Sequence, residues 1–392
     1  MKTTHHTTYT ITYGGWYQRT TLHLSEVYNF LSYGTSHLDL SPTTLQKFHH
    51  KLQLTNVNRE SGYLEYVKAT TTSGIEIRYY EDGLYVLEIS SDTISKGQET
   101  LETYFEECFN PAISYIFSLG APTPKVLANI KTNHPVAVSF SPKDEKHFVL
   151  DESIFGKVYS SVTSGKITVY KTPAYIIVSA PLGNKSINDL IEMQIFFREF
   201  KDQLEKYLHI HRTVWEEISA IKESNNIKGK DVEEARGQLD GYQKTINLIS
   251  NRINQMGSYV NTRSSIAEHL AIEKEMIVLF EYKFETLTDT LSYIKEVWKM
   301  TGDYLSSAIG NLVEIKNQST SNNLKSLQTI TSIGVISGIL GYLSASTLPR
   351  ISFAGAIYFV ILFCLTWLMN YIIAQKYKNR TYSLKFGNRT DI

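Results

Sequence analysis

Two long apolar segments stand close together near the C-terminal end of the sequence. The chain carries no charged residue between Lys325 and Arg350, and a second uncharged segment follows at once and ends at Lys376. A helix rises about 1.5 Å per residue, so about 20 apolar residues span a bilayer core about 30 Å thick. The pattern therefore predicts a transmembrane hairpin, with spans at 327–348 and 351–375. A helical hairpin buried in a large soluble core is the alternative interpretation.

Basic residues predict the orientation of this hairpin. Arg350 is the only basic residue in the short connection, whereas Lys376, Lys378 and Arg380 directly follow the second segment. Cytoplasmic loops carry an excess of lysine and arginine. We therefore expect an inner (plasma) membrane protein with both termini cytoplasmic and a cytoplasmic tail at 376–392.

The first apolar segment is rich in small and hydroxyl residues, whereas the second is bulky. Thr331, Gly334, Gly338 and Gly341 recur at spacings of three and four, which places them on one face of a helix. Such a face is either a packing seam between helices or the lining of a pore. A single helix encloses nothing, so a pore would require several copies of the chain.

The pattern of residues 1–185 predicts a mixed α/β domain. Short β-rich segments separated by turn residues lie at both ends, and a helical segment at 94–119, interrupted at Pro111, lies between them. The predicted strands are 7–13, 63–71, 75–80, 84–90, 136–140, 148–150, 166–170 and 175–179. Clustered strands with helices between them favour an α+β fold over a doubly wound sheet.

From Ser186 to residue 326 the period becomes helical and predicts a coiled-coil stalk. Apolar residues recur every seven positions in two helices, which is typical of long helices that pack along a seam. They are Val232, Leu239, Ile246, Ile253 and Val260 in one helix, and Leu270, Ile277, Phe284, Leu291, Trp298, Leu305 and Leu312 in the next. We expect one continuous helix from about Ser265 into the first apolar segment.

Composition excludes little, and the motifs give no support to catalysis. The chain has 39 basic and 39 acidic residues, so its net charge indicates no class of partner. Its two cysteines, Cys108 and Cys364, predict no disulfide framework. The segment 164–168 lacks the upstream glycine of a phosphate-binding loop. We find no nucleophile–base pattern and expect no enzymatic activity.

The order of these parts resembles the CorA-type magnesium transporter superfamily. The resemblance is carried by an α/β domain, a long stalk helix, a two-span hairpin and the sequence around Gly341, Tyr342 and Leu343. These three residues stand where the family has a Gly-Met-Asn signature at the outer mouth of the pore. Because Leu343 replaces the asparagine that holds a hydrated cation, the chain is similar to the branch of the family that lacks the signature.

The resemblance implies a homopentameric channel in a lipid bilayer. The first spans would line the pore through Asn323, Leu327 and Thr331, with the glycines on the same face, and the second spans would face lipid. A divalent cation such as Mg²⁺ is the cofactor or cargo that the family implies.

Family members without the signature include CRISPR-associated CorA-like effectors of antiviral defence. They respond to a nucleotide messenger made from S-adenosylmethionine and ATP. The resemblance therefore implies a channel opened by such a messenger at the N-terminal domain, without direct binding of nucleic acid. Aromatic and basic residues near turns are the candidate contacts: Trp16, Arg19, Arg78 and Lys166.

Two other functions stay open at this stage. The chain could be a divalent-cation transporter with a drifted signature, although residues 344–350 contain no carboxylate to hold a cation. It could also be a membrane-anchored coiled-coil scaffold without a pore, in which the heptads serve assembly alone.

Overall fold

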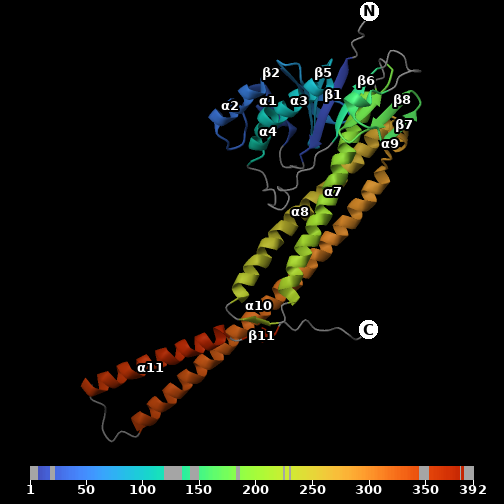
Figure 1. Cartoon of the computed structure of the whole chain (residues 1–392). Helices are drawn as coiled ribbons and strands as arrows, with labels where there is room; N and C mark the ends of the chain where they lie inside the picture. Colours follow the sequence, from blue (N-terminus) through green and yellow to red (C-terminus); the bar gives the residue numbers. More distant parts are fainter. Residues whose placement is uncertain are drawn as a thin grey trace, which may run out of the picture. The chain divides into compact units, whose positions relative to one another are not determined.

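The computed structural model describes residues 8–17, 23–118, 135–141, 150–181, 186–223, 226–228, 231–343, 353–379 and 381–383. The chain forms two compact units (Figure 1). Unit 1 comprises 1–210 and 248–296, and unit 2 comprises 211–247 and 297–392. Three long helices, α7 (Ser186–Glu223), α8 (Val232–His269) and α10 (Phe284–Leu343), have residues in both units.

Unit 1 is built around one mixed sheet. In spatial order its nine strands are β2 (Leu54–Ser61), β3 (Glu65–Thr71), β4 (Glu76–Tyr80), β5 (Leu84–Ser91), β1 (Tyr9–Trp16), β6 (Val136–Phe140), β9 (Tyr175–Ser179), β8 (Ile167–Lys171) and β7 (Ser160–Ser164). Only the pairing of β6 with β9 is parallel, and the other neighbours are antiparallel. The first strand of the chain therefore lies in the middle of the sheet.

Most of the predicted strands are confirmed. The β-rich segments at 136–140 and 175–179 coincide with β6 and β9, and those at 75–80 and 84–90 match β4 and β5 within one residue. The strands β2 and β7 were missed, because their sequences, LTNVNRES and SSVTS, are mostly polar. Both are edge strands, where one flank of the strand is unpaired. Of the predicted strand at 148–150, only Leu150 is described, and it is not in a strand.

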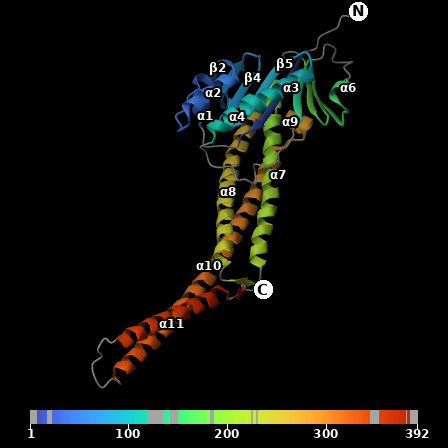
Figure 2. The same cartoon turned by 60° about the vertical axis from the view of Figure 1, so that its left-hand side comes forward.

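Four helices cover one face of the sheet (Figure 2). They are α1 (Leu24–Tyr33), α2 (Pro42–Leu52), α3 (Ile94–Tyr104) and α4 (Asn110–Ile116), and their apolar side chains form one core with alternate residues of the strands. A π-helical turn at Phe105–Phe109 joins α3 to α4. Pro111 has no amide hydrogen to donate, so the irregular turn falls where the regular helical ladder cannot continue. The short helix α6 (Glu152–Phe155) contributes Phe155 to the same core.

The other face of the sheet is covered by parts of α7 (Ser186–Glu223) and α8 (Val232–His269) that belong to unit 1. Trp16 of β1 stacks on Phe200 of α7 with 5.5 Å between the ring centroids, and its Nε1 donates to the Asp82 carbonyl oxygen at 2.6 Å. Arg78 of β4 forms ion pairs with Glu88 at 2.9 Å and with Glu192 of α7 at 2.8 Å. Charged as well as apolar contacts therefore hold the helices to this face.

The predicted single helix from Ser265 is wrong. Ser265 lies inside α8, which ends at His269, and a separate helix α9 (Glu273–Phe280) follows before α10 begins. Ala271 and Glu281 have positive φ values of 54° and 63°, which end one helix before the next begins. The predicted heptad runs through both breaks, and Ile277 is accordingly 37% exposed.

The remaining heptad positions are buried as predicted, except Leu270, which directly follows α8 and is only partly buried. All five in α8 are buried, and so are Phe284, Leu291, Trp298, Leu305 and Leu312 of α10 (Phe284–Leu343). In unit 2, Trp215 of α7 stacks on Tyr304 of α10 with 4.4 Å between the ring centroids. Unit 2 also contains a two-stranded sheet of β10 (Asn226–Lys228) and β11 (Thr381–Ser383).

The predicted transmembrane hairpin requires correction. The part of the chain that the structure describes contains no helix with both the length and the apolar content needed to cross a membrane. The two predicted spans, 327–348 and 351–375, fall on the end of α10 and on α11 (Phe353–Lys378). The residues between these helices, 344–352, lie outside the described residues, so the described part of each predicted span is shorter than the span itself. The fold class with a transmembrane hairpin, the membrane-channel description and the inner-membrane localisation are corrected on this finding.

Candidate functional site

The candidate site is a pocket where the sheet opens between β1 and β6. β1 pairs with β6 only through Thr10, Ile11 and Thr12, because β6 begins at Val136. On its other side β1 stays paired with β5 as far as Trp16. No strand among the described residues therefore lies beside the edge of β1 at Gly14 and Gly15, and a pocket of about 550 Å³ occupies this place. That volume falls within the range of roughly 300–1,000 Å³ that is typical of small-molecule sites.

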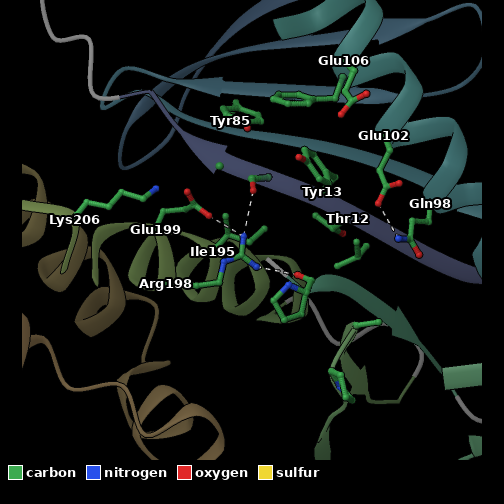
Figure 3. A pocket seen from close by; sticks show the side chains of 17 residues that line it. Thr12, Tyr13, Tyr85, Gln98, Glu102, Glu106, Ile195, Arg198, Glu199 and Lys206 are labelled. Atoms are coloured by element: carbon green, nitrogen blue, oxygen red, sulfur yellow. Dashed lines mark hydrogen bonds and ion pairs between the residues drawn. The ribbon is translucent and has the colours of Figure 1, made fainter. Parts of the chain in front are cut away.

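Three parts of unit 1 line the pocket (Figure 3). The strands provide its middle, α3 and the π-helical turn provide one wall, and α7 provides the opposite wall. The lining residues are Thr12, Tyr13, Gly14, Gly15, Tyr85, Gln98, Glu102, Phe105, Glu106, Pro135, Val136, Pro173, Ala174, Ile195, Arg198, Glu199 and Lys206.

Arg198 of α7 bridges the opening in the sheet. Its Nη1 donates to the Pro135 carbonyl oxygen at 3.0 Å, and its Nη2 donates to the Gly14 carbonyl oxygen at 3.2 Å. Both carbonyl groups lie where pairing between β1 and β6 has ended, so the guanidinium group replaces the missing strand contacts. Glu199 accepts from the same Nη2 at 3.0 Å. One side chain of α7 thus contacts both edges of the opening.

The pocket contains more acidic than basic side chains. Glu102 and Glu106 lie one helical turn apart on the α3 side, and Glu199 lies on α7. Arg198 is engaged by Glu199 and two carbonyl groups, and Lys206 Nζ lies 3.7 Å from Asp202 Oδ2. Burial raises the pKa of Tyr13, and Glu199, Glu102 and Glu106 raise it further while Arg198 opposes them. The three carboxylates therefore all influence the ionisation of one hydroxyl group, that of Tyr13.

Aromatic rings form the part of the lining nearest the core. Tyr85 stacks on Phe105 with 5.5 Å between the ring centroids, and Tyr13 lies 5.0 Å from Phe105. Burial strongly raises the pKa of Tyr85. A Cβ atom on Gly15 would lie 2.5 Å from the Tyr85 hydroxyl oxygen, so the absence of a side chain at Gly15 makes room for this ring.

The lining residues that the structure describes do not include the usual residues of covalent catalysis. The described lining residues include no cysteine, histidine or serine. Such a nucleophile with an adjacent base is the usual arrangement for covalent catalysis. The predicted lack of enzymatic activity stays a prediction.

The four predicted ligand contacts do not form one site. Trp16 and Arg78 lie in the buried interface of the sheet with α7, and neither lines the pocket. Lys166 is exposed in the turn between β7 and β8, several strands away across the sheet. Arg19 lies outside the described residues. Basic and aromatic residue types near turns were therefore a poor guide to this site.

The predicted pore residues lie in α10. Leu327 is 52% exposed, Thr331 Oγ1 donates to the Leu327 carbonyl oxygen at 2.8 Å, and a Cβ atom on Gly334 or Gly338 would meet nothing within 4 Å. Asn323, Gly341, Tyr342 and Leu343 are helical, but their side chains lie outside the described residues. The pore that they were predicted to line required membrane spans, which the structure does not support.

Sequence reasoning missed the whole pocket. Its acidic groups come from residues about 100 positions apart, and α3 and α7 read as ordinary amphipathic helices. The local signal that was present is the pair Gly14–Gly15 inside a β-rich segment, because glycine within a strand marks a bulge or a close approach.

No group of three or more His, Cys, Asp or Glu side chains within the described residues could hold a metal ion, and the predicted Mg²⁺ remains an untested expectation. A second pocket, of about 430 Å³, lies between the start of α1, the hairpin of β2 and β3, the turn between β4 and β5, and α8, and it is lined by Arg59, Glu65, Glu81 and Asp82 among others. No known family model and no curated protein sequence matches this chain. The resemblance to the CorA superfamily therefore stays a prediction.

Proposed function

We propose that this protein is a ligand-responsive regulator in which a small molecule binds the pocket between β1, β6, α3 and α7. The observation that carries the proposal is the position of Arg198, which lines the pocket and holds α7 to both edges of the open sheet. A ligand in the pocket would contact the sheet and α7 together.

Because α7 forms one wall of the pocket, a ligand bound there would change the position of this helix. Ile195, Arg198, Glu199 and Lys206 line the pocket, and the same helix continues to Glu223, beyond the end of unit 1 at Ile210. A ligand shifts an equilibrium between two arrangements only by its difference in affinity for them. A ligand that contacts both α7 and α3 would bind more tightly to the arrangement in which the two walls are at the right distance. This provides the difference in affinity between the two arrangements.

The test is ligand binding to the full-length chain, measured by calorimetry and thermal unfolding with a panel of nucleotides and small metabolites. The nucleotide messenger implied by the resemblance belongs in this panel. Ala174 is an exposed residue of the lining, so Ala174→Trp should fill the mouth of the pocket without disturbing the core. A ligand at 100 times its Kd stabilises the native state by about 2.7 kcal/mol.

A matched variant separates occlusion of the pocket from a general effect of added tryptophan. Ser161 is exposed on β7 and does not line the pocket, so Ser161→Trp should leave binding unchanged. Equal binding by wild type and Ala174→Trp would contradict the proposal.

A second candidate function, self-assembly, is favoured by a different observation. Large apolar side chains are exposed on the last part of α10 and along α11. They are Leu324, Leu327, Ile333, Val335, Ile336, Phe353, Ile357, Val360, Ile361, Phe363, Leu365, Trp367, Leu368, Met369, Tyr371 and Ile372. Monomeric proteins rarely expose so many large apolar side chains on one surface, and such a surface is typical of an interface. We propose that copies of the chain assemble through these helices, in line with the oligomer that the resemblance implies.

Light scattering of the purified chain tests the assembly. Val335→Lys and Ile336→Lys place charges in this surface and should shift a discrete oligomer toward monomer. Met300→Lys is the control, because Met300 is also exposed on α10 but lies well before the apolar surface. A wild-type monomer, or an oligomer that withstands both substitutions, would exclude this function.

A further inference from the structure

The break between α9 and α10 has no cause in the local sequence. From Glu273 to Thr301 the chain contains no glycine or proline, which are the usual causes of a sharp bend in a helix. The structure nevertheless ends α9 at Phe280, and Glu281 takes the left-handed conformation with a φ value of 63°. A residue with a Cβ atom disfavours this conformation, and glycine is the usual residue there. Contacts with the rest of unit 1 must therefore impose the bend.

Tyr282, the next residue, makes the contact that can impose it. Its ring lies flat on the ring of Phe197 of α7, with 4.1 Å between the centroids and 2° between the planes. Phe197 is only 4% exposed and also lies 5.6 Å from the ring of Phe284, the first residue of α10. One buried side chain of α7 therefore contacts both the break and the start of the helix that follows it.

The turn of α7 that carries Phe197 also lines the pocket. Arg198 and Glu199 are lining residues, whereas Phe197 contacts the break. Burial raises the pKa of Tyr282, and Gln194 and Arg198 act against this rise, so both of these α7 side chains lie near its hydroxyl group. A movement of this turn of α7 would therefore change the pocket and the contact with Tyr282 together.

The sequence across the break retains the pattern of one continuous helix. Ile277 stands one heptad before Phe284, and Phe280 stands one heptad before Leu287. Phe280, Phe284 and Leu287 are buried, but Ile277 is 37% exposed. A straight helix would place Ile277 in line with the buried positions of α10. The sequence therefore favours an arrangement other than the bent one that the structure shows.

We propose that Glu281 is a hinge between a bent arrangement, in which Tyr282 stacks on Phe197, and a straight one, in which α9 and α10 form one helix. In the bent arrangement the stack compensates for the left-handed conformation of Glu281. In the straight arrangement Glu281 is helical and Ile277 extends the apolar seam of α10. The helix α7 selects between the two, because it carries Phe197. The inference rests on the proposed function only for its trigger, which is a ligand that moves α7.

The test is the distance between two spin labels on the full-length chain without ligand. Lys274→Cys and Ser292→Cys place the labels at exposed positions on either side of Glu281, in a background with Cys108→Ser and Cys364→Ser. A continuous helix separates these two positions by about 27 Å, at about 1.5 Å per residue, and a bend shortens the distance. We expect the wild-type chain to give mainly the shorter distance.

Substitutions test the stack and the hinge separately. Tyr282→Leu should raise the population at the longer distance by about twofold to tenfold, which is the usual contribution of an aromatic pair. Tyr282→Phe keeps the ring and should leave the distances unchanged. Adding Glu281→Gly to Tyr282→Leu should restore the shorter distance, because glycine tolerates the left-handed conformation and disfavours the helix. Tyr304→Leu is the matched control, since it removes the stack on Trp215 in unit 2 and should change neither population.

Amide exchange in the sheet gives a second readout. In the bent arrangement α9 packs against the edge strand β7, and backbone groups of an edge strand are open unless another element covers them. Tyr282→Leu should therefore speed exchange in β7 more than in β2, which is the other edge strand. No such difference would contradict the straight arrangement.

The hinge is excluded if the distances are the same in wild type, Tyr282→Leu and Phe197→Leu. It is also excluded if Glu281→Gly does not reverse the effect of Tyr282→Leu. An equal change in Tyr304→Leu would mean that the helices loosen in general, which would overturn the proposal as well. Because these measurements use no ligand, the hinge can fail while the pocket binds a ligand, and it can be confirmed while no ligand of the panel binds.

Discussion

Arg263 of α8 and Asp82 of the turn between β4 and β5 form a buried, two-point ion pair. Arg263 Nε donates to Asp82 Oδ2 at 2.7 Å, and Nη2 donates to Oδ1 at 3.1 Å, with side-chain exposures of 4% and 2%. The guanidinium group also lies 4.8 Å from the ring centroid of Tyr80. A helix whose residues are about 180 positions away in sequence is thereby fixed to one turn of the sheet.

We predict that Arg263→Met destabilises the native state by about 3–5 kcal/mol, because it leaves the Asp82 carboxylate buried without its partner. The double variant Arg263→Met, Asp82→Leu should recover much of this loss, since it leaves no buried charge at the pair. Denaturant unfolding of the full-length chain measures both.

The control is the exposed ion pair of Arg59 with Glu65, whose side chains are 43% and 45% exposed. Arg59→Met should change the free energy of unfolding by less than about 1 kcal/mol. An equally small effect of Arg263→Met would show that the buried pair is no more important to stability than this surface pair.

The sheet was largely predictable because its central strands are marked by their own residues. The segments that became β4, β5, β6 and β9 are β-branched or aromatic and end at turn residues, so local pattern and tertiary structure agree. The heptad positions of α8 were likewise predictable from period alone. The breaks at Ala271 and Glu281 were not, because neither residue type favours a positive φ and only the surrounding packing imposes it.

Two glycines in helices should respond to alanine in opposite directions. A Cβ atom on Gly97 of α3 would lie 2.1 Å from Ile11 Cδ1, and Ile11 is fully buried in the core. Gly241 of α8 has nothing within 4 Å of the same position. Overpacking costs about 1–3 kcal/mol, whereas alanine is favoured over glycine in an open helix by about 1 kcal/mol.

We therefore expect Gly97→Ala to lower the Tm and Gly241→Ala to raise it. Thermal unfolding followed by circular dichroism measures both in the same buffer. A rise for Gly97→Ala would mean that Ile11 moves aside at no cost and that the contact between α3 and β1 is looser than its geometry indicates.

His211 should make unit 2 sensitive to mild acid. Its ring lies 5.9 Å from the ring centroids of both Trp215 and Trp298, and burial, followed by the charge of Arg212, lowers its pKa. The native state therefore binds a proton less readily than the unfolded chain does. The contribution of neutral His211 to stability is fully present above the unfolded value of about 6.5 and is lost as the pH falls through the lowered value.

Comparison of wild type with His211→Gln isolates this contribution from the other histidines. The difference in free energy of unfolding between the two proteins should shrink as the pH is lowered from 7.5 toward 5. Tryptophan fluorescence follows the transition, because Trp215 and Trp298 both lie beside the ring. A difference that stays constant over this range would exclude the titration of His211 as a source of acid sensitivity.

The candidate site was far less predictable than the sheet, for a physical reason. Thr12, Glu102 and Glu199 each look ordinary in their own segments, since glutamate on a helix is usually a solvated residue. They come together at one pocket because, within the described part of the chain, β6 begins late and leaves the edge of β1 open. The prediction of membrane spans failed in another way: it followed from the length of uncharged sequence, and the helices in the described part of the chain do not meet the requirement for crossing a membrane.

Arg198 provides the last prediction, because it is the only side chain of α7 shown to donate to both edges of the opening among the described residues. Arg198→Met keeps much of the length of the side chain but removes its donors, and it leaves the carbonyl groups of Pro135 and Gly14 without their partner. Hydrogen bonds to charged groups contribute about 1.5–3 kcal/mol, so the free energy of unfolding should fall by about that amount. Lys201→Met, on an exposed face of the same helix at 63% side-chain exposure, should lower the free energy of unfolding by less than about 0.5 kcal/mol.

Hydrogen exchange distinguishes a local bridge from general destabilisation. Loss of the Arg198 side chain should speed amide exchange at the start of β6 more than in β4, which lies across the sheet. Equal acceleration in the two strands would mean that Arg198 supports the fold as a whole and does not hold this opening together.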